Sequence, residues 1–218
     1  MAKTEKLSGT KQHTVYKLSD GTRVPGVTTV LGVLDKGRAL LVWANKIGLE
    51  GIQLNKYVDK LATVGTLAHY LVECELTDQI PELSSFSNEE IDKAENCLLS
   101  FYEWQKQHKI ERKLNEQILV SEEYRYGGTC DFYCLLNGIE TLIDFKTGSG
   151  IYQEYYWQVC AYRNLLIENG YPVKQVRILN IPRKETEEFQ EKIYTKFDKG
   201  FEVFKHALAI YRLKKKVN

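Results

Sequence analysis

Two aspartates occupy adjacent strands of a predicted β-hairpin. The dipeptide Asn137-Gly138 stands between two apolar runs, which is the strongest short-range signal for a two-residue type I′ turn. Such a turn fixes the strand register and places Asp131 directly across from Asp144, with both side chains on one face of the sheet. Opposed carboxylates, with Cβ atoms about 4.5 to 5.5 Å apart, destabilise a sheet unless a cation or a proton lies between them. The pattern therefore predicts a divalent metal site.

A lysine follows on the same face of the second strand. Lys146 comes two residues after Asp144, and alternate residues of a strand share a face. Hard cations such as Mg²⁺ take oxygen ligands from one or two carboxylates and from substrate phosphates. A neighbouring ammonium can orient a water molecule or neutralise charge that develops on a phosphate. These groups are the parts of a phosphodiester hydrolase.

The same charges have other interpretations. A surface ladder of alternating charges needs no metal, although the pair Gly127-Gly128, which suits a bulge or a close backbone approach, weighs against it. A bulge at this pair would change the register of the hairpin. A glycosidase uses two carboxylates across a sugar-sized cleft and does not require an adjacent lysine. No phosphate-binding G-x-x-x-x-G-K-[ST] loop and no zinc pattern accompany these residues.

Several further residues follow a pattern of G-x-x-D, a hairpin, D-F-K-T and a helix bearing Q-x-x-x-Y. The matching residues are Gly128, Asp131, Asp144, Phe145, Lys146, Thr147, Gln158 and Tyr162. Upstream, the stretch from Gly65 to His69, followed by Glu73, is similar to a G-T-x-x-H-x-x-x-E helix. Residues 24–29 are similar to the N-terminal segments of phage-encoded proteins that carry the same pattern. Residues of about 24–181 thus resemble the PD-(D/E)XK nuclease superfamily, in particular its RecB-like, phage-type exonuclease branch.

The resemblance implies a role for each metal-site residue. His69, Asp131 and Asp144 would bind Mg²⁺ or Mn²⁺, together with the backbone carbonyl of Phe145. Lys146 would activate or position the attacking water. From the residues alone, a lone helical histidine such as His69 is more often structural than a metal ligand. Iron–sulfur members carry a cysteine cluster after the Q-x-x-x-Y helix, and since this chain has no cysteine after position 160, no iron–sulfur cluster is expected.

The resemblance also implies substrate-binding residues. Gln158 and Tyr162 lie four residues apart on one helical face and would hold a substrate phosphate or the lysine. Tyr152 and Trp157 lead into this helix and are candidates for stacking on unpaired DNA bases. Taken alone, Tyr162 suits a core position and Gln158 an exposed one. Other aromatic and basic candidates for DNA contact are Trp43, Trp104, Tyr155, Tyr156, Arg183-Lys184 and residues 211–216.

Three further glutamates are candidate site residues. Glu73 closes the upstream helix motif. Either Glu122 or Glu123 matches an acidic position that precedes the G-x-x-D strand, and the sequence does not choose between them. An exposed carboxylate at the end of a strand is the alternative for both.

The periodicity of apolar residues predicts the elements that position these groups. It indicates an α/β fold with an N-terminal helical elaboration. The resemblance implies that the core of this fold is PD-(D/E)XK restriction-endonuclease-like, with helices flanking a mixed central sheet. The predicted order is a hairpin over 13–30, two or three short helices over 37–78 broken at Gly48, Gly51 and Gly65, a helix from Ser87 or Asn88 to about 108, strands over 114–124, 128–136 and 139–146, a helix over 152–168, strands over 173–181 and 188–196, and a basic helix over 200–216. We expect one nuclease domain over 1–218, with a helical block at about 37–108, a catalytic core at about 114–181 and a C-terminal strand and basic helix at 188–216.

Composition fits this interpretation. The 218 residues include 30 Lys plus Arg and 29 Asp plus Glu, so a polyanion must be met by a local patch rather than by net charge. A hydrophobic content of 43% excludes collagen-like and disordered chains. Residues 1–12 lack the apolar run of a signal or anchor, so an intracellular, cytoplasmic protein without a membrane partner is expected. Five cysteines without a C-x-x-C pair predict reduced, mostly buried thiols.

The function expected from these features is a Mg²⁺- or Mn²⁺-dependent DNA exonuclease of DNA repair or recombination. Its partner would be DNA with a free end or a single-stranded portion, and an oligomer is compatible with this expectation. One alternative is an endonuclease on the same core, which would need base-reading loops and dimerisation. Another is a DNA-end binding module without turnover, which the presence of every acidic residue and the lysine disfavours.

Overall fold

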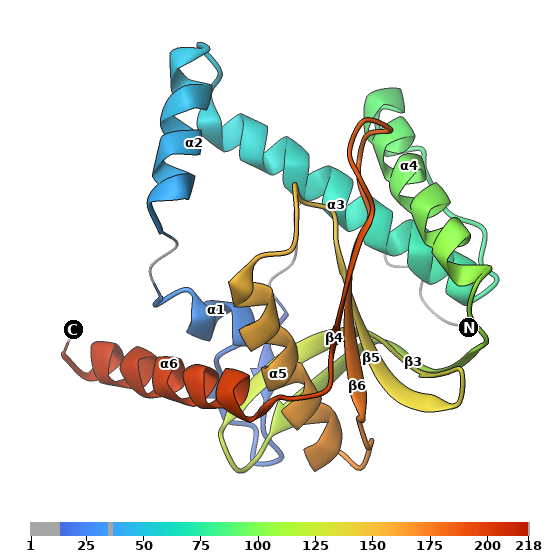
Figure 1. Cartoon of the computed structure of the whole chain (residues 1–218). Coiled ribbons are helices and arrows are strands. Elements are labelled where there is room, and N and C mark those ends of the chain that lie inside the picture. Colours follow the sequence, from blue (N-terminus) through green and yellow to red (C-terminus); the bar gives the residue numbers. More distant parts are fainter. Residues whose placement is uncertain (1–13, 35–36, 218) are drawn as a thin grey trace.

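Helices cover both faces of a mixed β-sheet (Figure 1). The computed structural model describes residues 14–34 and 37–217. Within these residues the elements are β1 (Tyr16–Lys17), β2 (Arg23–Val24), α1 (Val27–Leu31), α2 (Gly37–Leu49), α3 (Leu54–Leu76), α4 (Asn88–Gln105), β3 (Ile110–Ser121), β4 (Tyr126–Leu136), β5 (Ile139–Lys146), α5 (Gln153–Glu168), β6 (Gln175–Asn180), β7 (Gln190–Tyr194) and α6 (Asp198–Val217). The larger sheet has the order β3-β4-β5-β6-β7, and β5 and β6 are parallel while their other neighbours are antiparallel. The predicted α/β fold with helices flanking a mixed sheet is confirmed.

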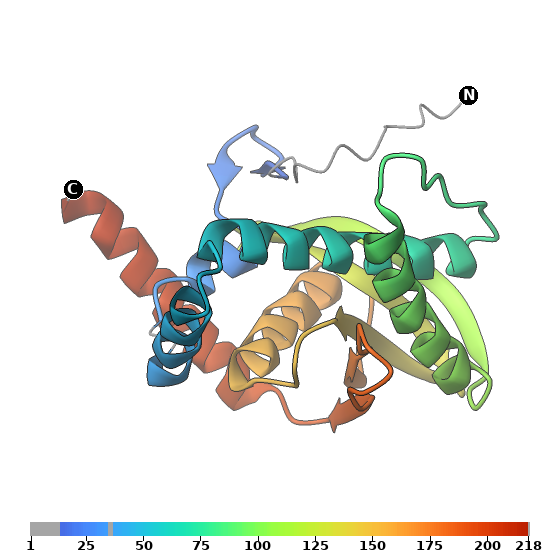
Figure 2. The same cartoon turned by 90° about the horizontal axis from the view of Figure 1, so that it is seen from above.

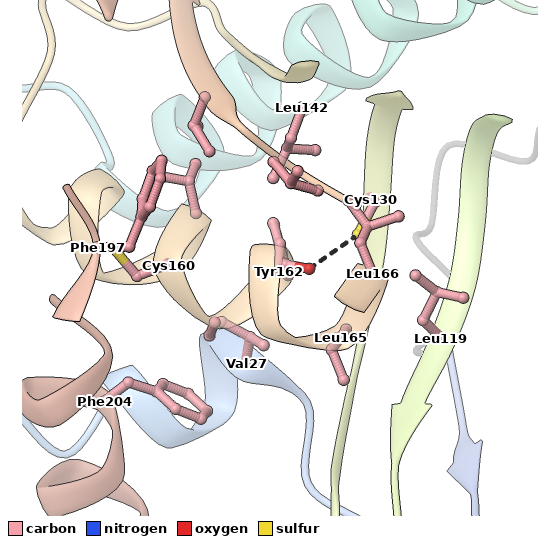
Figure 3. Close-up of a cluster of buried hydrophobic side chains, with 14 of the residues drawn as sticks. Val27, Leu119, Cys130, Leu142, Cys160, Tyr162, Leu165, Leu166, Phe197 and Phe204 are labelled. Carbon is pink, nitrogen blue, oxygen red and sulfur yellow. Dashed lines mark hydrogen bonds between the residues drawn. The ribbon is translucent and has the colours of Figure 1, made fainter. Parts of the chain in front are cut away.

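The two faces of the sheet bury separate hydrophobic cores. One face packs against α1, α5 and α6, and the other packs against α3 and α4 (Figure 2). Neighbouring residues of β5 divide between them, because Leu142 points to the α5 side and Ile143 to the α3 side. Figure 3 shows the first core, where Tyr162, Leu165 and Leu166 of α5 lie beside β4. The expected metal-site residues therefore lie at the border between the sheet and helices on both faces.

The N-terminal hairpin is shorter than predicted. A hairpin is present as expected, with Tyr16 paired to Val24, but it does not continue to residue 30, since residues 27–31 form α1. Val27 and Val30 are 1% and 0% exposed in the core shared with α5 and α6. Tertiary packing thus outweighs the β preference of this Val-Thr-Thr-Val stretch. His13, where the predicted hairpin began, lies outside the described residues.

Residues 37–78, predicted as two or three short helices, form α2 and one long helix, α3. A break is present at Gly51, whose φ is +75°. The predicted breaks at Gly48 and Gly65 are wrong, because α2 runs through the first glycine and α3 through the second. A Cβ at Gly65 would lie 3.1 Å from Oγ1 of Thr147, in the loop that follows β5. This glycine therefore lets α3 approach the end of β5 closely rather than ending the helix.

Local signals account for the other boundaries. Glu90 accepts hydrogen bonds from the backbone N–H and the hydroxyl of Ser87, so α4 begins with the expected cap and ends at Gln105, three residues short of the predicted end. Asn137 and Gly138 have φ values of 52° and 83°, as a type I′ turn requires. The remaining predicted strands and helices are present with boundaries shifted by a few residues.

Two composition-based expectations can be compared with the structure. All five cysteines lie within the described residues and are buried, free thiols, as predicted. No helix in the described ranges has the length and apolarity needed to cross a membrane.

Candidate metal centre

The hairpin register is as predicted, but the ladder between β4 and β5 stops just before the two aspartates. Its last pair is Phe132 with Ile143, one residue short of Asp131 and Asp144. Beyond it, Oδ2 of Asp131 accepts a 2.8 Å hydrogen bond from the backbone N–H of Phe145. The expectation that Asp131 and Asp144 are paired residues of the two strands is therefore corrected. The side-chain carboxylate of Asp131, rather than a backbone carbonyl of β4, accepts the hydrogen bond at the end of β5.

Three side chains from separate elements converge at this point. Nδ1 of His69, on α3, lies 3.7 Å from Oδ2 of Asp131 and 3.8 Å from Oε1 of Glu116, on β3. Among the described residues, these three offer ligand atoms that all lie within 4.8 Å of one another. One imidazole and two carboxylates suit Mn²⁺ well, and the carboxylates suit Mg²⁺. The residues thus fit a divalent cation.

Sequence reasoning missed Glu116. The residues on either side of it pair with Phe132 and Cys130, so Glu116 lies across from Asp131, and its φ of +41° marks an irregular point in β3. The loop over 122–125 that joins β3 to β4 has four residues and carries no turn signal that fixes a register. Because the register of β3 against β4 cannot be counted from this loop, no signal in the sequence places Glu116 across from Asp131.

Asp144 lies beside this cluster in an ion pair. It is 1% exposed, and Oδ2 lies 2.5 Å from Nζ of Lys146. Neither carboxylate oxygen accepts a well-oriented hydrogen bond from a described residue. Of the predicted ligands, the structure thus brings His69 and Asp131 together with Glu116, and it holds Asp144 against the lysine.

Burial and neighbouring charges shift the protonation of the site. Desolvation raises the pKa of Asp144 to about 6, with a smaller upward contribution from Asp131. Desolvation and Glu116 raise the pKa of Asp131. Burial alone lowers the pKa of His69, but Asp131 and Glu116 outweigh it and the net shift is upward. A cluster of carboxylates with raised pKa values is stabilised by binding a cation.

The lysine stays charged in this setting. Desolvation lowers the pKa of Lys146, but Asp144 and Asp131 raise it more, so the net shift is upward. Its Nζ also lies 4.9 Å from the centre of the Tyr155 ring. Lys146 is therefore a hydrogen-bond donor and a source of positive charge rather than a base.

The Q-x-x-x-Y pair lies next to the carboxylates. Nε2 of Gln158 donates a 2.8 Å hydrogen bond to the hydroxyl of Tyr162, which is 6% exposed. Burial, Asp144 and Asp131 raise the pKa of Tyr162 well above its usual value, so the phenol keeps its proton. A Cβ at Gly128 would lie 2.6 Å from the Tyr162 ring, which confirms the predicted close approach at this glycine.

Of the other candidate glutamates, one lies beside the cluster of His69, Glu116 and Asp131, and two lie in the loop before β4. Glu73 lies one turn after His69 on α3, and burial and Glu116 raise its pKa, which places it at the edge of the cluster. Glu122 instead accepts a hydrogen bond from the backbone N–H of Ser19 in the hairpin. Glu122 and Glu123 belong to the loop before β4, five residues or more from Asp131 along a strand that rises about 3.3 Å per residue. Among the described residues, the glutamate that offers a ligand atom beside His69 and Asp131 is Glu116 of β3, not Glu122 or Glu123.

The aromatic candidates differ in accessibility. Tyr152 caps α5, is 46% exposed, and its hydroxyl lies 2.5 Å from the hydroxyl of Ser149. Trp157 is partly buried on the same helix. Trp104 is 5% exposed and stacks on His108 in the core, so the suggestion that it stacks on bases is wrong.

Metal binding at this cluster should depend on pH. Protons compete with a cation for Asp144, whose pKa is about 6, and for Asp131 and His69, whose pKa values are also raised. We expect the increase in melting temperature caused by Mn²⁺ to be small at pH 5 and to grow as the pH rises to 7. Without metal, the sign reverses: folded Asp144 holds its proton more tightly than unfolded Asp144, so wild-type stability relative to Asp144→Asn falls as the pH rises from 4 to 7. Thermal melts at fixed ionic strength, with Mn²⁺ or EDTA, measure both trends; a Mn²⁺ effect that is independent of pH would contradict them.

Comparisons with known proteins give little at the level of sequence. No protein-family model matches this chain, and no curated protein sequence matches it. Among solved structures, the chain is similar to LHK-Exo in complex with dAMP, with a TM-score of 0.44 and 9% identity over 89% of this chain and 88% of that chain. It is also similar to a second structure of LHK-Exo, described as an alkaline exonuclease from Laribacter hongkongensis. The TM-score is 0.43, with 9% identity over 88% of this chain and 87% of that chain. The argument for a function therefore rests on the side chains described above.

Proposed function

We propose that this protein is a Mg²⁺- or Mn²⁺-dependent deoxyribonuclease that hydrolyses DNA from its ends. The observation that carries the proposal is the convergence of His69, Glu116 and Asp131 beside the Asp144–Lys146 ion pair. The proposal takes residues 1–218 as one nuclease domain of the PD-(D/E)XK superfamily, in its RecB-like, phage-type branch.

Each residue has a part in this chemistry. A divalent cation bound here would supply positive charge to the scissile phosphate and lower the pKa of a bound water. His69, Glu116 and Asp131 would hold that cation, with Asp144 turning to it from the lysine. The backbone carbonyl of Phe145 would be a further ligand, and the hydrogen bond that its N–H donates to Asp131 supports this by bringing the residue to the cluster.

The remaining polar groups act on water and phosphate. The charged ammonium of Lys146 donates to the attacking water or to a phosphate oxygen and neutralises the negative charge of the transition state. The protonated Tyr162 hydroxyl accepts from Gln158 and keeps its own proton to donate. Gln158 and Tyr162 orient the phosphate from the α5 side of the sheet.

Action at DNA ends is proposed from the arrangement around the site. α3 supplies His69 and lies over one face of the sheet, while exposed Tyr152 stands where α5 begins. An aromatic ring at such an entrance grips an unstacked base, whereas a paired duplex hides its base faces. This favours a strand that enters from its terminus.

The test compares one DNA molecule as a linear duplex and as a covalently closed circle, at equal phosphate concentration and low salt. We expect the linear form to be degraded with Mg²⁺ or Mn²⁺, no degradation in EDTA, and persistence of the circle. Cutting of the circle at a comparable rate would transfer the assignment to an endonuclease. Binding of linear DNA without hydrolysis under either metal would leave a DNA-end binding module.

A further inference from the structure

Asn180 is a buried polar residue that the proposed chemistry does not use. Within the described ranges, the buried polar or charged residues are Ser121, Thr141, Asp144 and Asn180. Ser121 and Thr141 have hydrogen bonds through their hydroxyls. Asn180 is 2% exposed, and its Oδ1 has no hydrogen-bond partner among the described residues. An unpaired buried acceptor costs stability, so its presence calls for a function.

The sheet places Asn180 beside the lysine of the site. It is the last residue of β6, and the parallel register pairs it with Lys146, the last residue of β5. The backbone N–H of Ile181 donates a 2.8 Å hydrogen bond to the Lys146 carbonyl, which fixes the two strand ends together. Register partners share a face, and Ile178, two residues before Asn180, packs on the α5 side. Asn180 and Lys146 therefore lie side by side on the face that carries Asp144.

Cation binding creates a need for an acceptor at this place. The Lys146 ammonium pairs with Asp144, and it would have to leave that carboxylate if Asp144 turned to hold a divalent cation. The side chain of Lys146 is 15% exposed, so the displaced ammonium has little access to water. Gln190, which faces Asn180 from β7, already uses Oε1 to accept from the backbone N–H of Ile151. Among the described residues, Oδ1 of Asn180 is an acceptor without a partner that stands on the strand next to the lysine.

We propose that Asn180 is a positioning residue for Lys146. Its Oδ1 accepts a hydrogen bond from Nζ when Asp144 binds the cation, and it thereby keeps the ammonium at the adjoining ends of β5 and β6, facing the phosphate. The inference rests on the proposed function for the metal and the reaction. It adds a residue that holds Lys146 in the metal-bound site, as Asp144 holds it in the metal-free site.

The first test is the variant Asn180→Leu, which keeps the side-chain size and removes the acceptor. In EDTA we expect a higher melting temperature than that of wild type, because an unpaired buried acceptor is lost. Mn²⁺ affinity, measured by calorimetry without DNA, should fall about 10- to 100-fold, as loss of a hydrogen bond to a charged group predicts. Asn180→Asp, which keeps an acceptor oxygen, should bind Mn²⁺ at least as tightly as wild type. Thr141→Val removes another buried polar group of the sheet and should leave Mn²⁺ affinity unchanged.

The second test asks whether Asn180 acts through the lysine. In the Lys146→Met background no ammonium has to be displaced, so adding Asn180→Leu should change Mn²⁺ affinity by less than about twofold. An equal loss of affinity in both backgrounds, an unchanged affinity in Asn180→Leu, or a lower melting temperature in EDTA would overturn the inference.

Failure of the inference is distinguishable from failure of the proposed function. A wild-type protein that shows the expected Mn²⁺ pattern but cuts no DNA would refute the nuclease and leave the role of Asn180 intact. An active wild-type nuclease whose Mn²⁺ affinity equals that of Asn180→Leu would refute only the role of Asn180. A wild-type protein that binds no Mn²⁺ would overturn both.

Discussion

Asp144→Asn and Lys146→Ala should each reduce the hydrolysis of linear DNA by about 10³-fold, the loss typical of removing one group that stabilises transition-state charge. Asp144→Asn replaces a charged ligand by a weak neutral one. Lys146→Ala removes the donor that faces the phosphate. Both side chains point toward the cluster rather than into either hydrophobic core. Rates with end-labelled linear DNA and Mn²⁺ measure the effect.

The fold should survive both changes. Desolvation raises the pKa of Asp144 to about 6 even though Lys146 lowers it, so without the lysine the carboxyl takes up a proton readily. Asn in place of Asp144 is neutral and similar in shape, so it carries no burial penalty for charge. Glu140→Gln, on the same strand and paired with Lys174, is the matched control and should keep full activity. Activity within tenfold of wild type in either site variant, with circular dichroism unchanged, would refute the assignment.

The parts of the fold predicted from sequence are those fixed by local chemistry. The Asn137-Gly138 turn permits positive φ at both residues, and it fixed the register that brings Asp131 and Asp144 to the same end of the hairpin. The Ser87 cap determined where α4 begins. In contrast, α1 forms because Val27 and Val30 bury themselves against distant helices, and no local pattern contains that information.

The candidate site was predictable only in part for the same reason. Asp131, Asp144 and Lys146 followed from strand alternation, whereas His69, Gln158 and Tyr162 were named through a family resemblance. Their convergence depends on how α3 and α5 pack on opposite faces of the sheet.

Two features of the site depend on irregular backbone. The β4–β5 ladder ends before Asp131 because its carboxylate bonds to the N–H of Phe145. Glu116 meets the cluster from a residue with φ of +41°. Departures from regular pairing leave no periodic trace in the sequence, so alternation alone could reveal neither of them.

Glu116→Gln should weaken Mn²⁺ binding about 10- to 100-fold and lower nuclease activity, since it removes one of the two carboxylates that lie within 4.8 Å of each other and of His69. The variant keeps the size of the side chain and the backbone of β3. Glu111→Gln, on the same strand but paired with Lys113, changes the net charge equally and should bind Mn²⁺ as wild type does. Calorimetry with Mn²⁺ on the three proteins measures the difference.

A second measurement connects this result to the geometry. In the metal-free protein, Glu116 raises the pKa of His69, so Glu116→Gln should lower that pKa, and an NMR titration of the His69 ring follows it directly. Glu111 has no such contact, and its variant should leave the His69 titration where it is. If Glu116→Gln lowers the His69 pKa but leaves Mn²⁺ affinity unchanged, Glu116 is a neighbour of the cation and not a ligand. The metal would then be held by His69, Asp131, Asp144 and the Phe145 carbonyl, the set that the family resemblance implies.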